Sequence, residues 1–397
     1  MRVLLVSPLP GVDPACGDVT YTQSLLADPP QGVRYETYAD AVARGAVREC
    51  ANRAALRDAL RTRRRVLHEF VRTAGAKAIN LLRARHVLFW EPFRFFDVRP
   101  GEYDLIHTHA FSARHTGADV PQVASNFAAL KYVYLYARGY SPLRTALMEK
   151  ADDALGRLLG VEVLSSHLPR TSRLIVFTQW LKDWYVRHGV MPADRVDVAP
   201  MYLPTPAPAS QSVVPKRIGF ISKDFDARGG PTLLEAFKIV RQKRPDAELW
   251  IIGTEPRIGR DEAVRQGITW LPYVDRPRLV DEIIPSFDVF AFPTEYDGFL
   301  VVLEAMSYGI PVATSDYQAI PELLDHGRAG LVSPMRDAMA LANNVLRLLE
   351  PEANAQYRAA VRERFVSTYS SDAARPKLRQ SYDKALLHRH AEQRRSA

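Results

Sequence analysis

The residues best able to do chemistry lie in residues 292–306. An apolar segment, residues 289–292, predicts a buried strand, and residues 301–308 predict the helix that follows it. The loop between them carries two carboxylates, Glu295 and Asp297. Backbone N–H groups at a helix start, beside the carboxyl end of a strand, favour anionic and polyhydroxyl ligands. The stretch therefore predicts a ligand site of that kind.

A third carboxylate, Glu304, stands directly after the apolar run at residues 300–303. A carboxylate among apolar neighbours is costly unless it is paired or lines a cleft. The alternative is a solvated glutamate on the outer face of the helix. The weak polar–apolar periodicity of this helix favours the cleft, so Glu304 is predicted to be a functional residue.

The elements that must position these residues alternate between strands and helices. The expected strands span residues 3–6, 103–109, 174–178, 196–200, 217–221, 248–253, 268–271, 289–292 and 312–314. The expected helices begin near residue 18 and span 180–188, 232–243, 278–284, 301–308 and 320–324. This alternation predicts an α/β protein with two Rossmann-like domains, whose parallel sheets face a cleft between the domains.

The domain boundary is expected at a segment rich in Pro and Ser, residues 204–212. Residues 1–205 would form the N-terminal, acceptor-binding domain, with a basic helical insertion at about 41–100. Residues 206–372 would form the C-terminal, donor-binding domain. A last helix, in residues 373–397, would pack back on the N-terminal domain.

The stretch from Glu295 to Ala313 resembles the Glu-x7-Glu signature of the large retaining glycosyltransferase family 4, with its Glu-Ala-Met…Gly-x-Pro-Val tail. The resemblance implies the GT-B fold, a contact between Glu304 and the nucleotide ribose, and a first carboxylate near the donor sugar. The spacing departs from the signature, because Glu295 is one residue too far from Glu304 and Asp297 is one too near. Both remain candidates, and Glu295 is slightly preferred because the shorter Asp297 would have to reach further.

The resemblance extends to other donor-binding positions. Gly298, Phe299 and Leu300 stand where the family's loop enters its helix. Residues 219–231 are similar to the family's strand, basic loop and glycine segment, which implies that Lys223 and Arg228 bracket the donor diphosphate. Fixed cations and helix-end N–H groups can stabilise a departing diphosphate without a metal or other cofactor.

Three further positions follow from the same resemblance. His109, at a strand end after His107, implies a cleft-facing catalytic histidine, although a lone histidine is as often a satisfied polar residue. Gly17 falls where the family has a Gly-Gly loop touching the diphosphate. Residues 270–274, with Tyr273, resemble the segment that holds the nucleotide base.

The net charge of +8 comes from one segment. Residues 41–85 hold 12 basic and 3 acidic residues, which leaves 53 − 12 = 41 basic and 45 − 3 = 42 acidic residues elsewhere. With the aromatic cluster at 89–96, the segment predicts either a solvated helical face or a surface for anionic membranes. No nucleic-acid-binding motif accompanies it. Two cysteines and no apolar run of spanning length predict a cytoplasmic protein, either free or peripheral on the inner membrane face.

Taken together, the sequence predicts a retaining glycosyltransferase that moves a sugar from a nucleoside-diphosphate sugar to a hydroxyl of an unidentified glycan, lipid-linked or natural-product acceptor. The same scaffold would also suit a sugar phosphorylase or epimerase, or a non-catalytic protein that binds nucleotide sugars or lipids.

Overall fold

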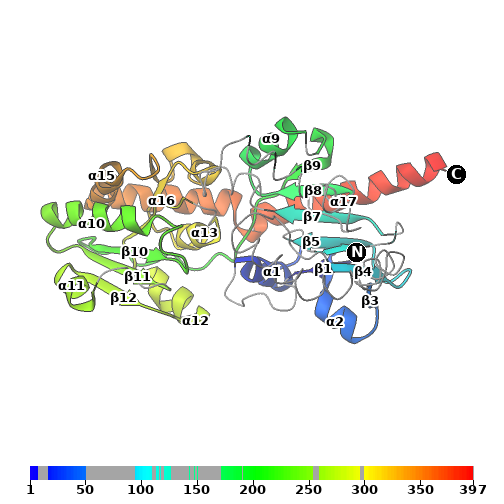
Figure 1. Ribbon diagram of the computed structural model, residues 1–397, viewed down its shortest axis with the longest axis horizontal. Helices are drawn as coiled ribbons and strands as arrows, with labels where there is room; N and C mark the ends of the chain where they lie inside the picture. Colours follow the sequence, from blue (N-terminus) through cyan, green and yellow to red (C-terminus); the bar gives the residue numbers. More distant parts are fainter. Residues whose placement is uncertain are drawn as a thin grey trace, which may run out of the picture.

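The fold consists of two parallel sheets that lie side by side along the long axis of the molecule (Figure 1). The structure is a computed structural model, and it describes residues 1–7, 17–50, 94–109, 113–115, 117, 120–126, 143, 147, 150, 171–189, 191–253, 259–295 and 299–396. The predicted α/β class with two Rossmann-like sheets is confirmed by this topology.

The first sheet has six parallel strands in the order β2-β1-β5-β7-β8-β9. These strands are β1 (Arg2–Val6), β2 (Arg34–Thr37), β5 (Leu105–His109), β7 (Gln122–Asn126), β8 (Arg173–Val176) and β9 (Val196–Val198). Every residue of β5, β7 and β8 is buried, as expected for parallel strands covered on both faces.

The second sheet repeats this architecture with strand order β12-β11-β10-β13-β14-β15, again all parallel. Its strands are β10 (Arg217–Ile221), β11 (Glu248–Ile252), β12 (Ile268–Leu271), β13 (Val289–Phe292), β14 (Val312–Ser315) and β15 (Leu331–Ser333). The order reverses at β10 and β13, so the loops after these two strands lie at the switch point where ligands bind in open α/β sheets.

The described residues of the N-terminal half contain the helices α1 (Gly17–Ala27), α2 (Tyr38–Ala43), α9 (Gln179–Arg187) and the 3-10 turn η4 (Ala193–Arg195). The C-terminal half adds α10 (Gly230–Lys243), α11 (Arg260–Arg265), α12 (Arg276–Arg278), η5 (Leu279–Ile283), η6 (Ile284–Ser286), α13 (Phe299–Ser307), α14 (Ile320–Leu323), η7 (Asp325–Gly327), α15 (Ala338–Leu349), α16 (Pro351–Thr368) and α17 (Ser371–Ser396). Helices α9, α10 and α13 begin and end within two residues of their predicted bounds.

A small third sheet corrects the prediction that the insertion at about 41–100 is helical. Strands β3 (Val47–Cys50) and β4 (Arg94–Val98) pair antiparallel, and β4 pairs with β6 (Ala113–His115). Phe96 and Val98 alternate inward and join a buried cluster, and this β-type burial outweighs the helix-favouring composition. The rest of the insertion, residues 51–93, lies outside the described residues.

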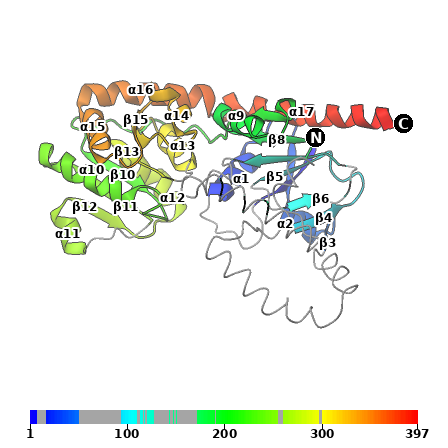
Figure 2. The same cartoon turned by 45° about the horizontal axis from the view of Figure 1, so that its top comes forward.

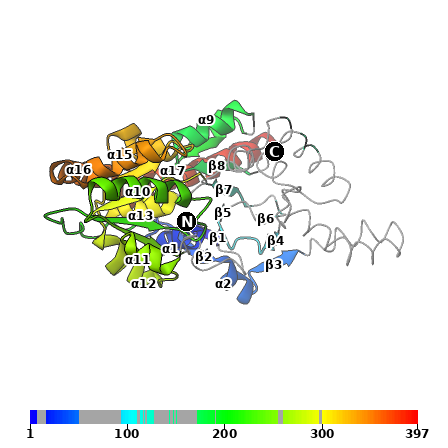
Figure 3. The same ribbon diagram turned by 60° about the vertical axis from the view of Figure 1, so that its left-hand side comes forward.

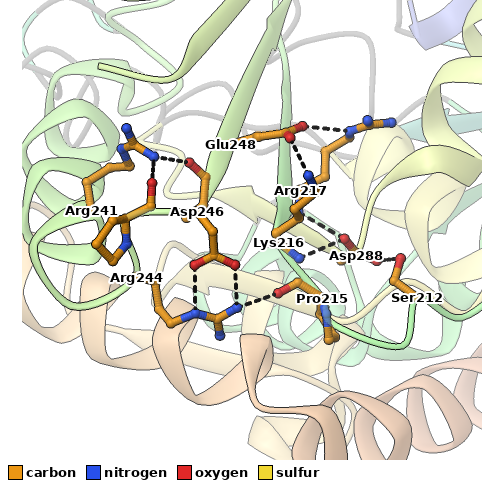
Figure 4. A network of polar contacts seen from close by, with 11 residues as sticks. Ser212, Pro215, Lys216, Arg217, Arg241, Arg244, Asp246, Glu248 and Asp288 are labelled. Carbon is orange, nitrogen blue, oxygen red and sulfur yellow. Dashed lines mark hydrogen bonds and ion pairs between the residues drawn. The ribbon is translucent and has the colours of Figure 1, made fainter. Parts of the chain in front are cut away.

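A buried carboxylate, that of Asp288, holds the chain where the linker meets the second domain (Figure 4). Asp288, just before β13, accepts hydrogen bonds from the backbone N–H groups of Lys216 and Arg217, both at 2.9 Å, and from the Ser212 hydroxyl. The Asp288 carbonyl accepts the Asn354 side chain of α16 at 2.9 Å. The start of β10 is thereby fixed to β13 and to the C-terminal helices.

Helices α16 and α17 run along one side of the molecule from the second domain to the first (Figures 1 and 2). On α17, the side chains of Leu378, Tyr382 and Ala385 are buried, and the helix contacts β7 and β8. Lys384 Nζ reaches Asp197 of β9 at 3.1 Å. The last helix therefore packs on the first sheet.

One carboxylate joins the two domains directly. Glu322 of α14, in the second domain, accepts hydrogen bonds from the backbone N–H groups of Gln179 at 2.7 Å and Trp180 at 2.8 Å. These N–H groups begin α9 of the first domain, where an anion also interacts favourably with the helix dipole. Figure 3 shows a second junction, where α1 and α13 lie near each other.

We expect Glu322→Gln to lower the free energy of unfolding by about 1 kcal/mol, because an amide keeps the size of the side chain but loses its charge at the start of α9. Thermal unfolding followed by circular dichroism measures the change. Glu235→Gln, at an exposed position of α10, is the matched control. Equal unfolding temperatures for the two variants would contradict the interdomain role of Glu322.

Candidate functional site

The loops after β10 and β13 approach each other at the carboxyl edge of the second sheet. Gly229 adopts φ +75°, and a Cβ atom there would lie 1.9 Å from the carbonyl oxygen of Pro293. Next to this contact, the Glu295 N–H donates to the Ala227 carbonyl at 3.1 Å. Only glycine permits such an approach, so Gly229 fixes the position of the basic loop against the carboxylate loop.

Lys223 and Arg228 both belong to the loop that leads from β10 into α10. The Ser222 hydroxyl donates to the Asp224 carbonyl at 2.8 Å and accepts the Asp224 N–H at 2.9 Å, which holds the loop in a tight turn. Lys223 is exposed and Arg228 half-buried. The structure therefore brings both predicted cations to the loop that precedes the start of α10.

Glu304 lies in the second turn of α13 and is only 5% exposed. Its Oε1 lies 2.5 Å from Nη2 of Arg276. Apart from this ion pair, Oε1 receives no hydrogen bond among the described residues. Burial raises the pKa of Glu304, and the neighbouring Arg276 opposes that rise. Glu304 is thus a buried acceptor that a ligand hydroxyl could satisfy.

Arg276 lies just after residues 270–274, the segment that resembles the family's base-binding segment, and it pairs with Glu304. Strand β12 ends at Leu271, and Asp275 then caps α12 by accepting the Arg278 N–H at 3.1 Å. Tyr273 lies between these elements and is 72% exposed. The predicted base-binding and ribose-binding positions therefore occupy adjacent parts of one edge.

The two candidates for the first carboxylate differ in what the structure describes. Glu295 Oε2 pairs with Arg336, at 2.6 Å from Nε and 2.5 Å from Nη2. Asp297 and Gly298 lie outside the described residues. Of the neighbouring predicted positions, Phe299 begins α13 and Leu300 packs half-buried against the main core. The choice between Glu295 and Asp297 stays a prediction.

His109 ends β5 at the carboxyl edge of the first sheet and is 1% exposed. Its ring packs against Tyr21 of α1, with the centroids 4.9 Å apart, and its Nδ1 lies 2.8 Å from Ser125 Oγ. Gly17 is the first residue of α1. Tyr21 thus connects His109 to a helix, α1, that contacts α13 of the second domain.

Sequence reasoning missed the basic partners of both glutamates. Arg276, at the start of α12, and Arg336, in the turn before α15, belong to no motif, and they meet Glu304 and Glu295 only through the tertiary fold. The positive φ of Arg336, +63°, is unusual for a residue other than glycine, but it cannot be read from sequence. No group of three potential metal ligands occurs in the part of the chain that the structure describes.

The fold and this site define a GT-B architecture, and comparison with known proteins agrees with it. Residues 215–351, about a third of the chain, match the family model described as Glycosyl transferases group 1. The matched region contains the basic loop, the carboxylate loop, Arg276 and Glu304.

Curated relatives are similar in sequence to part of this chain. The amylovoran biosynthesis glycosyltransferase AmsK of Erwinia amylovora is 31% identical over 156 residues, which cover 35% of this chain and 37% of that protein. The D-inositol 3-phosphate glycosyltransferase of Mycolicibacterium paratuberculosis is 25% identical over 320 residues, 72% of this chain and 68% of that protein. The chain thus matches little more than a third of AmsK.

Solved structures resemble the whole chain in fold. The sucrose-phosphate synthase of Thermosynechococcus elongatus has a TM-score of 0.60 at 18% identity, covering 97% of this chain and 99% of that one. Anabaena Alr3699/HepE, solved in complex with UDP and glucose, has a TM-score of 0.58 at 14% identity, covering 96% and 99%. In the part of the chain that is described, no helix is long and apolar enough to cross a membrane.

Arg276→Ala should destabilise the protein by about 2 kcal/mol at neutral pH, because it leaves the buried Glu304 carboxylate without its ion pair. The loss should fade in acid. The pKa of Glu304 is higher in the folded protein than in the unfolded chain, so the folded state binds its proton more tightly. This binding stabilises the fold fully below the unfolded pKa, and the stabilisation is lost as the pH rises through the folded pKa. Removing Arg276 raises the folded pKa further, so the variant loses more stability on the alkaline side.

Urea unfolding at several pH values between about 4 and 8 measures this difference. Arg278→Ala, two residues along and 54% exposed in its side chain, serves as the control. A stability loss for Arg276→Ala that is the same at every pH would show that the Glu304 pair is not its cause.

Proposed function

We propose that this protein is a retaining glycosyltransferase that transfers a sugar from a nucleoside-diphosphate sugar to a hydroxyl of a glycan acceptor. The observation that carries the proposal is the buried Glu304 carboxylate of α13, which pairs with Arg276 next to the segment that resembles the family's base-binding segment. A nucleoside diphosphate has matching chemistry: ribose hydroxyls to donate to a carboxylate, and phosphates to accept from cations and helix N–H groups.

The comparisons support this proposal from outside the chain. The matched family model spans the donor-site residues, and AmsK and the capsular polysaccharide glycosyltransferase CapM of Staphylococcus aureus are named for polysaccharide biosynthesis. Both names refer to the biosynthesis of a polysaccharide, which favours a glycan acceptor over a small natural product.

The proposed reaction breaks the bond between the anomeric carbon and the diphosphate oxygen and forms one to the acceptor oxygen on the same face. The diphosphate oxygen receives the acceptor proton, so no protein nucleophile and no metal or other cofactor is required. Lys223, Arg228 and the N–H groups at the start of α10 would stabilise the charge that grows on the diphosphate. Glu295 or Asp297 would contact the donor sugar, and His109 would face it from the first domain.

A donor screen tests the proposal. We expect one of a panel of UDP-, GDP- and ADP-sugars to be slowly hydrolysed, with release of the nucleoside diphosphate. Glu304→Gln should weaken the affinity for that nucleotide by about tenfold or more, because a charged acceptor of the ribose hydroxyls is lost. Lys223→Ala should weaken nucleoside diphosphate binding by about tenfold and leave free nucleoside binding unchanged, since it acts on phosphate. Calorimetry measures both affinities.

Glu235→Gln and Lys238→Ala, at exposed positions of α10, are the controls for charge. Conversion of the donor into an epimer without release of the nucleoside diphosphate would indicate an epimerase, and dependence on inorganic phosphate would indicate a phosphorylase. Tight binding without turnover, even with glycan acceptors, would indicate a binding protein. Failure to bind any nucleotide would refute the proposal, and an inverted product by NMR would refute retention.

We further propose that the enzyme works in the cytoplasm at an anionic membrane surface, through the basic excess of residues 41–85 and the aromatic residues up to 96. The wild type should co-sediment with vesicles containing phosphatidylglycerol at low salt. A triple variant, Arg63→Ala, Arg64→Ala and Arg65→Ala, should bind them less, because each basic residue near the surface contributes about 1 kcal/mol. Absence of wild-type binding at low salt would exclude a membrane role.

A further inference from the structure

A continuous chain of hydrogen-bonding side chains leads from the edge of the first sheet to His109. Tyr35 Oη of β2 lies 2.8 Å from Tyr382 Oη of α17, and Tyr382 Oη lies 2.7 Å from His107 Nδ1 of β5. The other ring nitrogen, His107 Nε2, lies 2.8 Å from Ser125 Oγ of β7. Ser125 Oγ lies 2.8 Å from His109 Nδ1. Four separate elements contribute to this chain.

The chain is almost entirely shielded from solvent. Tyr382, His107 and Ser125 are 0% exposed and His109 is 1% exposed, whereas Tyr35 at the far end is half-buried. Burial lowers the pKa of His107 to about 3, with a smaller contribution from His109. His107 is therefore neutral and carries a single ring hydrogen. Tyr382, His107 and Ser125 therefore have to share their hydrogens within this chain of contacts.

The limited number of hydrogens couples the donor and acceptor roles of these side chains to one another. Neutral His107 can donate from only one nitrogen, and the Ser125 hydroxyl has only one hydrogen for two histidines. Two arrangements supply every contact with one hydrogen and also use the hydroxyl hydrogens of both Ser125 and the fully buried Tyr382. In the first, Tyr35 donates to Tyr382, Tyr382 to His107, His107 to Ser125, and Ser125 to His109. In the second, every donation runs the opposite way.

The two arrangements place different hydrogens on His109. In the first, His109 Nδ1 accepts from Ser125, so the ring hydrogen of neutral His109 is on Nε2. In the second, His109 Nδ1 donates to Ser125. A doubly protonated His109 is compatible only with the second arrangement, because both of its nitrogens are donors. A change at His109 is thus tied to the donor direction at Tyr382.

We infer that Tyr382, His107 and Ser125 are positioning residues that set the tautomer and orientation of His109, with Tyr382 carrying this influence from the C-terminal helix. Packing supports a fixed geometry, because Tyr382 lies on the same buried face of α17 as Leu378 and Ala385. Lys384 further ties the helix to Asp197, which also pairs with Arg173. The consequence for catalysis rests on the proposed function, whereas the coupling itself does not.

Histidine tautomers can be read by long-range ¹H–¹⁵N NMR of the full chain labelled at histidine, with His107→Gln and His109→Gln used to assign the signals. We expect a single tautomer for each of the two histidines in the wild type. Tyr382→Phe removes the hydroxyl that contacts His107, so the nitrogen chemical shifts of both His107 and His109 should change. Ser125→Ala cuts the chain between the histidines, so Tyr382→Phe in that background should shift His107 only.

Tyr202→Phe is the matched control, because Tyr202 is a fully buried tyrosine whose hydroxyl donates to the Asp28 carbonyl at 2.8 Å, outside the chain. It should leave the tautomers of both histidines unchanged. If Tyr382→Phe shifted His107 but left His109 unchanged, the coupling would be refuted. Should Tyr382→Phe fail to fold, Ser125→Ala alone decides, because it must change the His109 tautomer if the inference is right.

A kinetic readout separates this inference from the proposed function. With a donor that is turned over, Tyr382→Phe should lower kcat about tenfold and leave the Kd for the nucleoside diphosphate unchanged, because the nucleotide binds in the second domain. If no donor is turned over, the proposed function fails while the tautomer measurement still decides the coupling. An unchanged kcat together with altered tautomers would refute the positioning role.

Discussion

The close approach of two backbone segments organises the candidate site. The loop after β10 meets the segment after β13 where Gly229 leaves no room for a side chain against the Pro293 carbonyl. This contact determines where α10 begins, where the basic loop lies and where Glu295 leaves the sheet. Because β10 and β13 are neighbours at the point where strand order reverses, the loops after them lie where open α/β sheets bind ligands.

Each carboxylate of the site is balanced by an arginine from another part of the second domain. Arg276 reaches Glu304 from the start of α12, and Arg336 reaches Glu295 from the turn before α15. Arg336 is 70% exposed in its side chain, so its pair with Glu295 contributes little stability, whereas the Glu304 carboxylate is buried and depends on its partner. Arg276 opposes the rise in the pKa of Glu304 that burial causes, and charged acceptors bind sugar hydroxyls more strongly than neutral ones.

The two domains are connected by contacts of different kinds. The linker is anchored at Asp288, Glu322 caps α9 across the boundary, and α17 returns to the first sheet. The last of these contacts brings Tyr382 into hydrogen-bonding distance of His107, so a residue near the C-terminus becomes part of the environment of His109. A glycosyltransferase of this architecture would use both domains, one for the donor and one for the acceptor, and the path of the chain links them.

The sequence by itself determined the fold class, most strands and helices of the second half, and the identity of Glu304 as an unusual carboxylate, because hydrophobic periodicity and motif spacing are local properties. It failed at residues 47–50 and 94–98, where helix-favouring neighbours concealed strands that only pairing and burial stabilise. Only the tertiary structure decided that Arg276 and Arg336 neutralise the glutamates, that Glu322 joins the domains, and that Ser125 and Tyr382 surround His107. These pairings unite residues as much as 275 positions apart, and no local pattern encodes which distant side chains meet when sheets and helices pack.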